Sequence, residues 1–150
     1  MLLLKNEQNL GFVKTVNKAL NLSKENVVLL NTDVVLPKNW ASRLLQPILY
    51  EEKIATVTPL SNAATIFSLP ILGKDCDFNA DINAVNNELS KINILNNNIN
   101  TPTGMGFCMA INKNAIKEIG GFDEIFDKGY GEENDWCQRA IAKGYKNKIA

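Results

Sequence analysis

The sequence predicts an α/β domain whose sheet is mostly parallel, with helices on both faces. Two observations lead to this prediction. Segments with apolar residues at helical spacing alternate along the chain with short runs of strand length. One of these runs, Val27–Leu30, is apolar at every position, which is typical of a parallel strand covered on both faces. The length of 150 residues corresponds to one domain or most of one.

The first part of the chain is expected to form two helices and three strands. Apolar residues share one helical face over Gly11–Leu22, and Asn39 is a good N-cap for a second helix. Val27–Leu30 and Ile54–Thr58 are predicted strands, and residues 1–4 are interpreted as a short buried strand. Those four residues are too few for a signal peptide or a membrane span.

The second part begins with residues 60–80, which follow no helical or strand period and are expected to form a loop. A loop of that length inside a compact domain is usually functional. Asp81 is expected to cap the next helix, and the polar run 96–100 is predicted to be rich in turns. The remaining predicted elements are a strand over 105–111, a helix over 112–119, a helix over 132–143 and a strand from Tyr145.

The composition excludes several classes of function. Sixteen basic residues balance sixteen acidic ones, so no bulk charge favours nucleic acid or an anionic membrane as a partner. The chain has no histidine, which excludes His-based zinc sites and Ser-His-Asp triads within it. A carboxylate is therefore the expected base in any acid–base chemistry. The three cysteines are widely spaced, and no run is long and apolar enough for a transmembrane helix.

Asn31, Thr32 and Asp33 directly follow a predicted buried strand. Ligands of open α/β sheets bind at the carboxyl ends of the strands, and a carboxylate there can hold a divalent cation. The alternative for Asp33 is an ordinary turn aspartate, since Asn-x-Asp is common in turns.

A second group of carboxylates, Glu132, Glu133 and Asp135, lies at a predicted helix start. Acidic residues in a first turn stabilise the helix dipole, which is the simpler interpretation. Crowded carboxylates also raise one another's pKa values, which suits a general base. Gly104 and Gly106 form a third element, where a ligand can approach the backbone closely or where a strand begins with a bulge.

In their joint order these segments resemble the family 2 glycosyltransferases of the GT-A fold, and the rhamnosyltransferase-like branch most closely. The resemblance spans nearly the whole chain, although each motif is short. It is carried by Asn9-Leu10-Gly11-Phe12, Asn31-Thr32-Asp33, Trp40, the stretch 104–111, Gly120-Gly121-Phe122-Asp123-Glu124, the stretch 131–139 and Gly144-Tyr145.

The resemblance implies a Rossmann-like nucleotide-diphospho-sugar transferase fold and an inverting transfer of a hexosyl or deoxyhexosyl group. The expected donor is a UDP, dTDP or GDP sugar, and the expected acceptor is a hydroxyl of a glycan or glycoconjugate. In the family a DXD-type motif binds Mn²⁺ or Mg²⁺, which holds the diphosphate. The motif falls on Asn31 and Asp33, which makes Asp33 the expected metal ligand. The expected donor-binding residues are Asn31, Thr32, Asp33, Gly104 and Gly106, with Ser61 and Asn62 as further candidates.

The family's Glu-Asp motif falls on Glu132 and Glu133, and Glu133 takes the position of the catalytic base. Glutamate stands where aspartate is usual and reaches one methylene further, so both Glu132 and Glu133 stay candidates for the base. Asp135, Trp136 and Arg139 match helix positions that shape the acceptor side of the site or support the helix.

Family members open with a strand that binds the nucleotide base, and they continue beyond the last predicted helix. Residues 1–150 are therefore expected to be a catalytic-domain fragment of a longer, cytoplasmic polypeptide, which meets a membrane only through other regions. One alternative is a non-catalytic module that binds a nucleotide sugar or glycan on the same fold. A weaker alternative is an interaction domain in which the acidic cluster only caps a helix.

Overall fold

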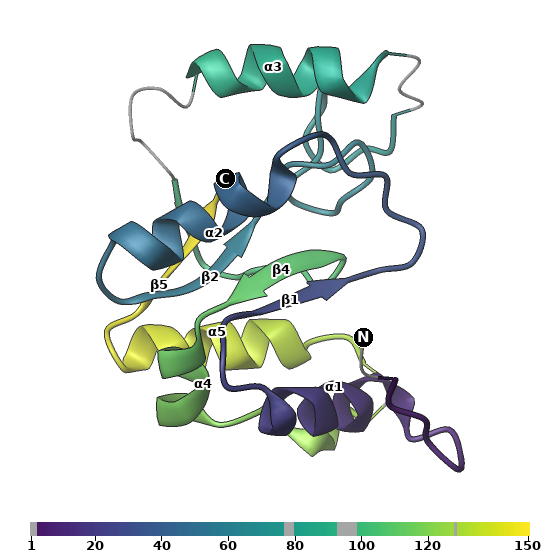
Figure 1. Cartoon of the computed structure of the whole chain (residues 1–150), viewed down its shortest axis with the longest axis vertical. Coiled ribbons are helices and arrows are strands. Elements are labelled where there is room, and N and C mark those ends of the chain that lie inside the picture. The colour runs from purple at the N-terminus through teal and green to yellow at the C-terminus, as the bar shows by residue number, and fades with distance from the viewer. Residues whose placement is uncertain (1–2, 77–79, 93–98, 128) are drawn as a thin grey trace.

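The computed structural model describes residues 3–76, 80–92, 99–127 and 129–150. It is an α/β structure built around one five-stranded sheet (Figure 1). In chain order the elements are α1 (Gly11–Leu22), β1 (Val27–Leu30), α2 (Trp40–Tyr50), β2 (Ile54–Thr58), α3 (Ile82–Ile92), β3 (Asn100–Thr101), β4 (Cys108–Ile111), α4 (Lys113–Ile119), the 3-10 helix η2 (Glu124–Phe126), α5 (Glu132–Ala142) and β5 (Lys146–Ile149).

The prediction of a mostly parallel sheet is wrong. The strand order is β1-β4-β2-β5-β3, and only the β2–β5 pair is parallel, whereas β1–β4, β2–β4 and β3–β5 are antiparallel. Strand β4 is antiparallel to both of its neighbours. It starts at the end of the sheet where β2 finishes, so it runs in the opposite direction to β2. An apolar run reports that a strand is covered on both faces, but it carries no information about the strand's direction.

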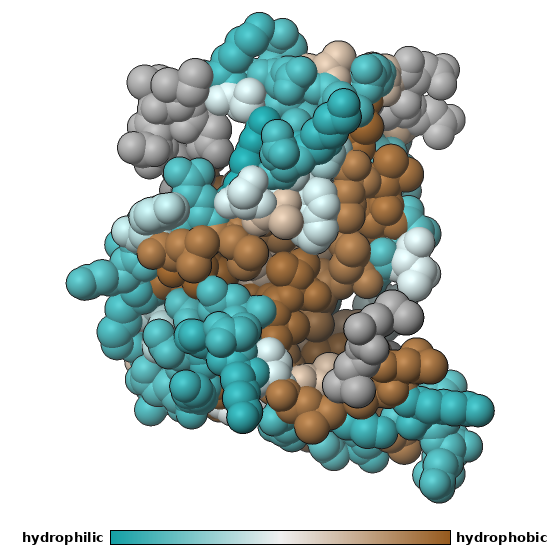
Figure 2. Space-filling model, viewed as in Figure 1, coloured by the Kyte–Doolittle hydropathy of each residue, from teal (hydrophilic) through white to brown (hydrophobic). Residues whose placement is uncertain are grey.

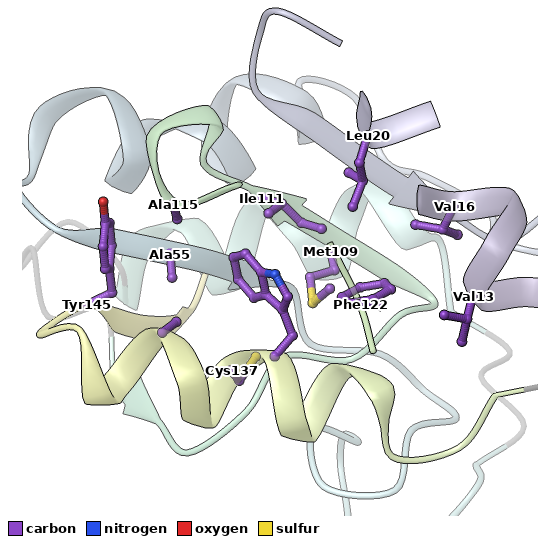
Figure 3. Packing of buried hydrophobic residues seen from close by; sticks show 12 residues of the cluster. Val13, Val16, Leu20, Ala55, Met109, Ile111, Ala115, Phe122, Cys137 and Tyr145 are labelled. Atoms are coloured by element: carbon purple, nitrogen blue, oxygen red, sulfur yellow. The ribbon is translucent and has the colours of Figure 1, made fainter. Parts of the chain in front are cut away.

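Helices do cover both faces of the sheet, as predicted (Figure 1). Alternate residues of β4 point to opposite sides: Met109 and Ile111 enter one core, and Cys108 and Ala110 the other. The larger core lies under α1, α4 and α5, and Figure 3 shows Met109 and Ile111 among its residues. The smaller core lies under α2 and includes Leu44, Ile48, Ile54 and Val57.

The predicted helices over 11–22, 112–119 and 132–143 and the strands over 27–30 and 54–58 are confirmed within one residue. Asp81 caps α3 as expected, because its carboxylate accepts a hydrogen bond of 2.8 Å from the backbone of Asn83. Asn39 does precede α2, but it has a left-handed backbone (φ 60°) and its side chain makes no capping hydrogen bond.

Two strand predictions need correction. The buried strand over residues 1–4 is not found in its described part, since Leu3 and Leu4 belong to no strand and are 81% and 37% exposed. The predicted strand over 105–111 begins only at Cys108. Residues 102–106 instead bond to side chains of α5 and β2, so their backbone is not available to the sheet. The turn-rich prediction over 96–100 falls largely outside the described residues.

Residues 60–76 and Ala80 contain no helix or named strand, as predicted for the long loop. None of the helices within the described ranges has the length and apolarity needed to cross a membrane. Apolar residues nevertheless reach the surface, and Figure 2 shows them gathered across the middle of one face, below the hydrophilic surface of α3. Leu30 and Val35 are exposed apolar residues at and just after the end of β1.

Candidate functional site

A cleft of about 300 Å³ lies at the edge of the sheet where β1 ends and β4 begins. Four segments of the sequence meet there: the start of α1, the end of β1, the loop before β4 and the start of α5. Four predicted site residues line the cleft together, namely Asn31, Gly106, Glu132 and Glu133. Its other lining residues are Phe12, Phe107, Gly129 and Tyr130.

The Glu133 carboxylate is held by the loop that precedes β4. The backbone N–H of Gly106 donates a hydrogen bond of 3.0 Å to Oε1 of Glu133. A β-carbon at position 106 would lie 2.4 Å from that oxygen, so this contact requires glycine. The predicted close approach at Gly106 is therefore made by a side chain of the protein itself.

Further hydrogen bonds fix the same loop along α5. The Thr103 hydroxyl donates to Oδ1 of Asn134 at 2.6 Å, and the Gly104 N–H donates to the buried Sγ of Cys137 at 3.1 Å. The Gln138 amide donates to the carbonyl of Pro102 at 2.7 Å. Four residues of this loop, 102, 103, 104 and 106, are thus hydrogen-bonded to side chains of α5. The loop therefore keeps a fixed position relative to the carboxylates at the start of that helix.

Glu132 has very different surroundings from Glu133. Only 3% of Glu132 is exposed, and its Oε2 is buried without a hydrogen-bond partner among the described residues. The backbone of Gly129 passes close to this carboxylate, since a β-carbon there would lie 3.4 Å from Oε1. An unmade hydrogen bond at a buried acceptor costs about 1–3 kcal/mol.

The pKa of Glu132 is raised above the ordinary glutamate value. Burial is the main cause, because it penalises the charged form, and the neighbouring Glu133 carboxylate adds to the rise. The backbone N–H groups of Glu132 and Tyr130 lower the pKa and offset part of this effect. A carboxyl whose pKa moves toward neutrality is better suited to accept a proton during a reaction.

The Asn31–Asp33 segment lies directly after β1. The N–H of Asn31 donates to the carbonyl of Phe107 at 2.8 Å, which joins the end of β1 to the start of β4. Asn31, Thr32 and Asp33 are all exposed, but only Asn31 lines the cleft.

No cluster of three His, Cys, Asp or Glu side chains suitable for a metal occurs within the described part of the chain. The one carboxylate of Asp33 and the amide oxygen of Asn31 are hard oxygen ligands. Such a set suits a cation that keeps water and takes its remaining ligands from a phosphate group. Asp33 as a metal ligand stays a prediction.

Asp135, Trp136 and Arg139 support the helix and the turn beside it. Arg139 forms an ion pair of 2.8 Å with Asp135 and donates to the carbonyls of Ile119 and Gly121. Trp136 is fully buried, and its indole N–H donates to the carbonyl of Gly120 at 2.8 Å. None of the three lines the cleft.

Sequence reasoning missed the aromatic lining of the cleft. Phe12 and Phe107 are half-buried there, while Tyr130 is 98% exposed. Tyr130 lies between two glycines, and all three residues have positive φ angles, which is uncommon for tyrosine. A tyrosine between two glycines is the one local signal of an unusual backbone here, and it carries no information about a position in the cleft.

The comparisons with known proteins add no identification. No family model matches the chain, and a search of curated proteins finds no match.

Proposed function

We propose that this chain carries the catalytic centre of an inverting glycosyltransferase with a GT-A type fold, which uses a nucleoside-diphosphate sugar. One observation supports the proposal above others. The segments that the resemblance identifies, at Asn31, Gly106 and Glu132–Glu133, line one cleft although about a hundred residues separate the first from the last. An acidic cluster that only capped a helix would have no reason to meet the other two segments.

The lining supplies the groups that an inverting transfer needs from the protein. In the reaction the acceptor O–H bond breaks, its oxygen forms a bond to the anomeric carbon, and the bond from that carbon to the diphosphate breaks with its electrons. A carboxylate of Glu132 or Glu133 takes the proton, as expected of a general base. A Mn²⁺ or Mg²⁺ ion, when bound, would neutralise charge on the diphosphate, and Asp33 is the residue proposed to hold it.

The second candidate is a module on the same fold that binds a nucleotide sugar or glycan without transferring it. It is favoured by the position of Asp33 outside the lining of the cleft, and by Asn31 in place of a first metal-binding aspartate. Both candidates require binding at the cleft, so they are separated by a transfer assay and not by a binding assay alone.

The test is a calorimetric titration of the chain with UDP, dTDP and GDP, with and without Mn²⁺, for the wild type and Asp33→Ala. Glu52→Ala, an exposed carboxylate in the turn before β2, is the control. We expect metal-dependent binding of one nucleotide that Asp33→Ala abolishes and Glu52→Ala leaves intact. Folded proteins that bind none of the three nucleotides would refute both candidates. Binding without transfer to any acceptor in a glycan panel would favour the second.

A further inference from the structure

Tyr130 combines an exposed aromatic side chain with a backbone that tyrosine rarely adopts. The residue is 98% exposed and has a φ angle of 73°, and it lies between Gly129 and Gly131, whose φ angles are also positive. A left-handed backbone is unfavourable for residues other than glycine, asparagine and aspartate, and an exposed ring buries no apolar surface in return. Core packing and the turn itself therefore do not explain a tyrosine here, and backbone outliers of this kind cluster at functional sites.

Tyr50 is the ordinary exposed tyrosine of the same protein. It is 81% exposed at the end of α2, but its backbone is helical and it does not line the cleft. Exposed apolar groups are common on protein surfaces and need no explanation when they occur singly. Tyr130 differs from Tyr50 both in its backbone and in its position at the cleft, so the two residues form a matched pair.

The turn that carries Tyr130 is held at both ends. The Gly129 N–H donates to the carbonyl of Phe126 at 2.9 Å, and the carbonyl of Gly131 accepts a hydrogen bond of 2.9 Å from the Asp135 N–H. A β-carbon at position 131 would lie 2.9 Å from the Phe126 ring, so the chain is closely packed there. The backbone is thus fixed, whereas the exposed ring can rotate about its side-chain bonds without any rearrangement of the fold.

Two further aromatic rings line the same cleft. Phe12 and Phe107 are half-buried, and Phe12 packs against the larger core while Phe107 packs against the smaller one. Their positions are therefore set by the fold. Two fixed rings and the movable ring of Tyr130 border one cleft of about 300 Å³, which is at the lower end of the range for small-molecule sites.

The polar lining indicates which ligand suits these rings. The charged residues that line the cleft in the described chain are Glu132 and Glu133, so an anionic ligand is disfavoured. The Asn31 amide and the Glu133 carboxylate can form hydrogen bonds with hydroxyl groups, and aromatic rings offer apolar contact area. Hydroxyl groups and an apolar C–H face occur together in an uncharged sugar ring. An organic cation is less favoured, because Glu132 is almost fully buried and burial raises its pKa.

We propose that the ring of Tyr130 stacks on the C–H face of an uncharged sugar ring bound in the cleft, and that this sugar is the acceptor of the proposed transfer. The acceptor role rests on the proposed function, whereas the stacking contact can be tested without it. In the free protein the ring is exposed to water. When the sugar binds, the ring rotates over it, and apolar surface of both is removed from water.

The test is saturation-transfer NMR with the methyl glycosides of glucose, galactose, mannose and N-acetylglucosamine as probes. Sugar protons that face an aromatic ring of the protein receive the most saturation. The variants are Tyr130→Phe, which keeps the ring, and Tyr130→Asn, which suits the left-handed backbone but removes the ring. Tyr50→Asn is the matched control, tetramethylammonium is the cation probe, and circular dichroism establishes that each variant is folded.

We expect at least one glycoside to bind the wild type and to bind Tyr130→Asn about 3–10-fold more weakly, the effect of losing one aromatic contact. Tyr130→Phe and Tyr50→Asn should keep the wild-type affinity. Release of the nucleoside diphosphate from UDP-glucose, dTDP-glucose and GDP-mannose with Mn²⁺ is the second readout. The same glycoside should accelerate this release, and Tyr130→Asn should raise the glycoside concentration needed by the same factor while leaving release to water unchanged.

The outcomes separate the stacking contact from the proposed function. A glycoside that binds Tyr130→Asn as tightly as the wild type, or a wild type that binds none of the four, would overturn the stacking contact whatever the donors do. Tyr130-dependent binding of tetramethylammonium instead of the glycosides would replace the sugar site by a cation site. If glycoside binding depends on Tyr130 but no donor releases its diphosphate, the stacking contact stands, and the proposed function and the acceptor role fail together.

Discussion

Two irregular segments of this molecule, residues 102–107 and residues 59–76, are held in different ways. The first is bonded to other elements: its backbone contacts Thr58 of β2 and Glu133, Cys137 and Gln138 of α5. The second, which forms part of the coil beneath α3 in Figure 1, bonds within itself. Its described hydrogen bonds join its own residues to one another, as between Asn62 and Cys76.

The difference shows how an irregular segment acquires a fixed place. Residues 102–107 have a defined position relative to the carboxylates of α5 because buried polar groups of the helix hold them. Residues 59–76 have an internal shape but no such bonds to the cleft. Ser61 and Asn62, expected as donor contacts, do not line the cleft, and their side chains bond to residues of their own segment.

The largest expected effect follows from replacing one buried aromatic residue in α5, the helix that holds residues 102–107, and one in residues 59–76. Trp136 is fully buried in the larger core, and Phe67 is 4% exposed but belongs to neither core cluster. We expect Trp136→Ala to lower the free energy of unfolding by about 3–5 kcal/mol, measured by urea denaturation. Phe67→Ala should cost clearly less, because the segment around it can collapse locally. Equal losses would show that residues 59–76 are as well anchored as α5.

A smaller effect is expected from adding one methyl group to a glycine in each segment. In Gly106→Ala the new carbon would lie 2.4 Å from Oε1 of Glu133, so the Glu133 carboxylate must move away and lose its hydrogen bond from the Gly106 N–H, at about 0.5–1.5 kcal/mol. In Gly73→Ala the nearest atom is 3.4 Å away, and the cost is the φ of +72°, on the order of 1–2 kcal/mol. Thermal unfolding measures both costs. Diphosphate release should fall in Gly106→Ala alone, and a loss in Gly73→Ala would contradict the comparison.

The smallest expected effect on stability is a gain. Burial raises the pKa of Glu132, so the folded protein holds this proton more tightly than the unfolded chain does. The resulting stability is present in acid and is lost as the pH rises from the ordinary glutamate value through the raised pKa. Glu132→Gln should therefore raise the unfolding temperature at pH 7 by about 2–4 °C, for a gain of about 1 kcal/mol. At pH 4 the same substitution should leave the unfolding temperature unchanged.

The matched control for this gain lies in the other segment. Asp75→Asn removes an exposed carboxylate from residues 59–76 and should leave the unfolding temperature unchanged at both pH values. A gain in Glu132→Gln that is equal at pH 4 and pH 7 would mean that it comes from packing and not from the buried charge. The gain is expected at a functional position because such positions commonly reduce stability.

The sequence by itself determined where the regular elements lie. Helical spacing of apolar residues located α1, the stop signal at Gly144 located the end of α5, and the apolar run Val27–Leu30 located β1. These features are local, because a helix or strand must present its apolar face or faces to a core whatever its partners are. The clustering of Glu132 and Glu133 at a helix start is local in the same sense, and it was predicted correctly.

Only the tertiary structure decided the direction of β4, the place of residues 102–106 and the different burial of the two glutamates. Adjacent residues of a helix point to different sides, so what surrounds Glu132 and Glu133 depends on chain that is distant in sequence. Gly106 reaches Glu133 only after the fold has brought the loop before β4 against α5, because the two residues are 27 positions apart in the sequence. Hydrogen bonds between distant segments leave no periodicity in the sequence, and for that physical reason the cleft became visible only in the folded chain.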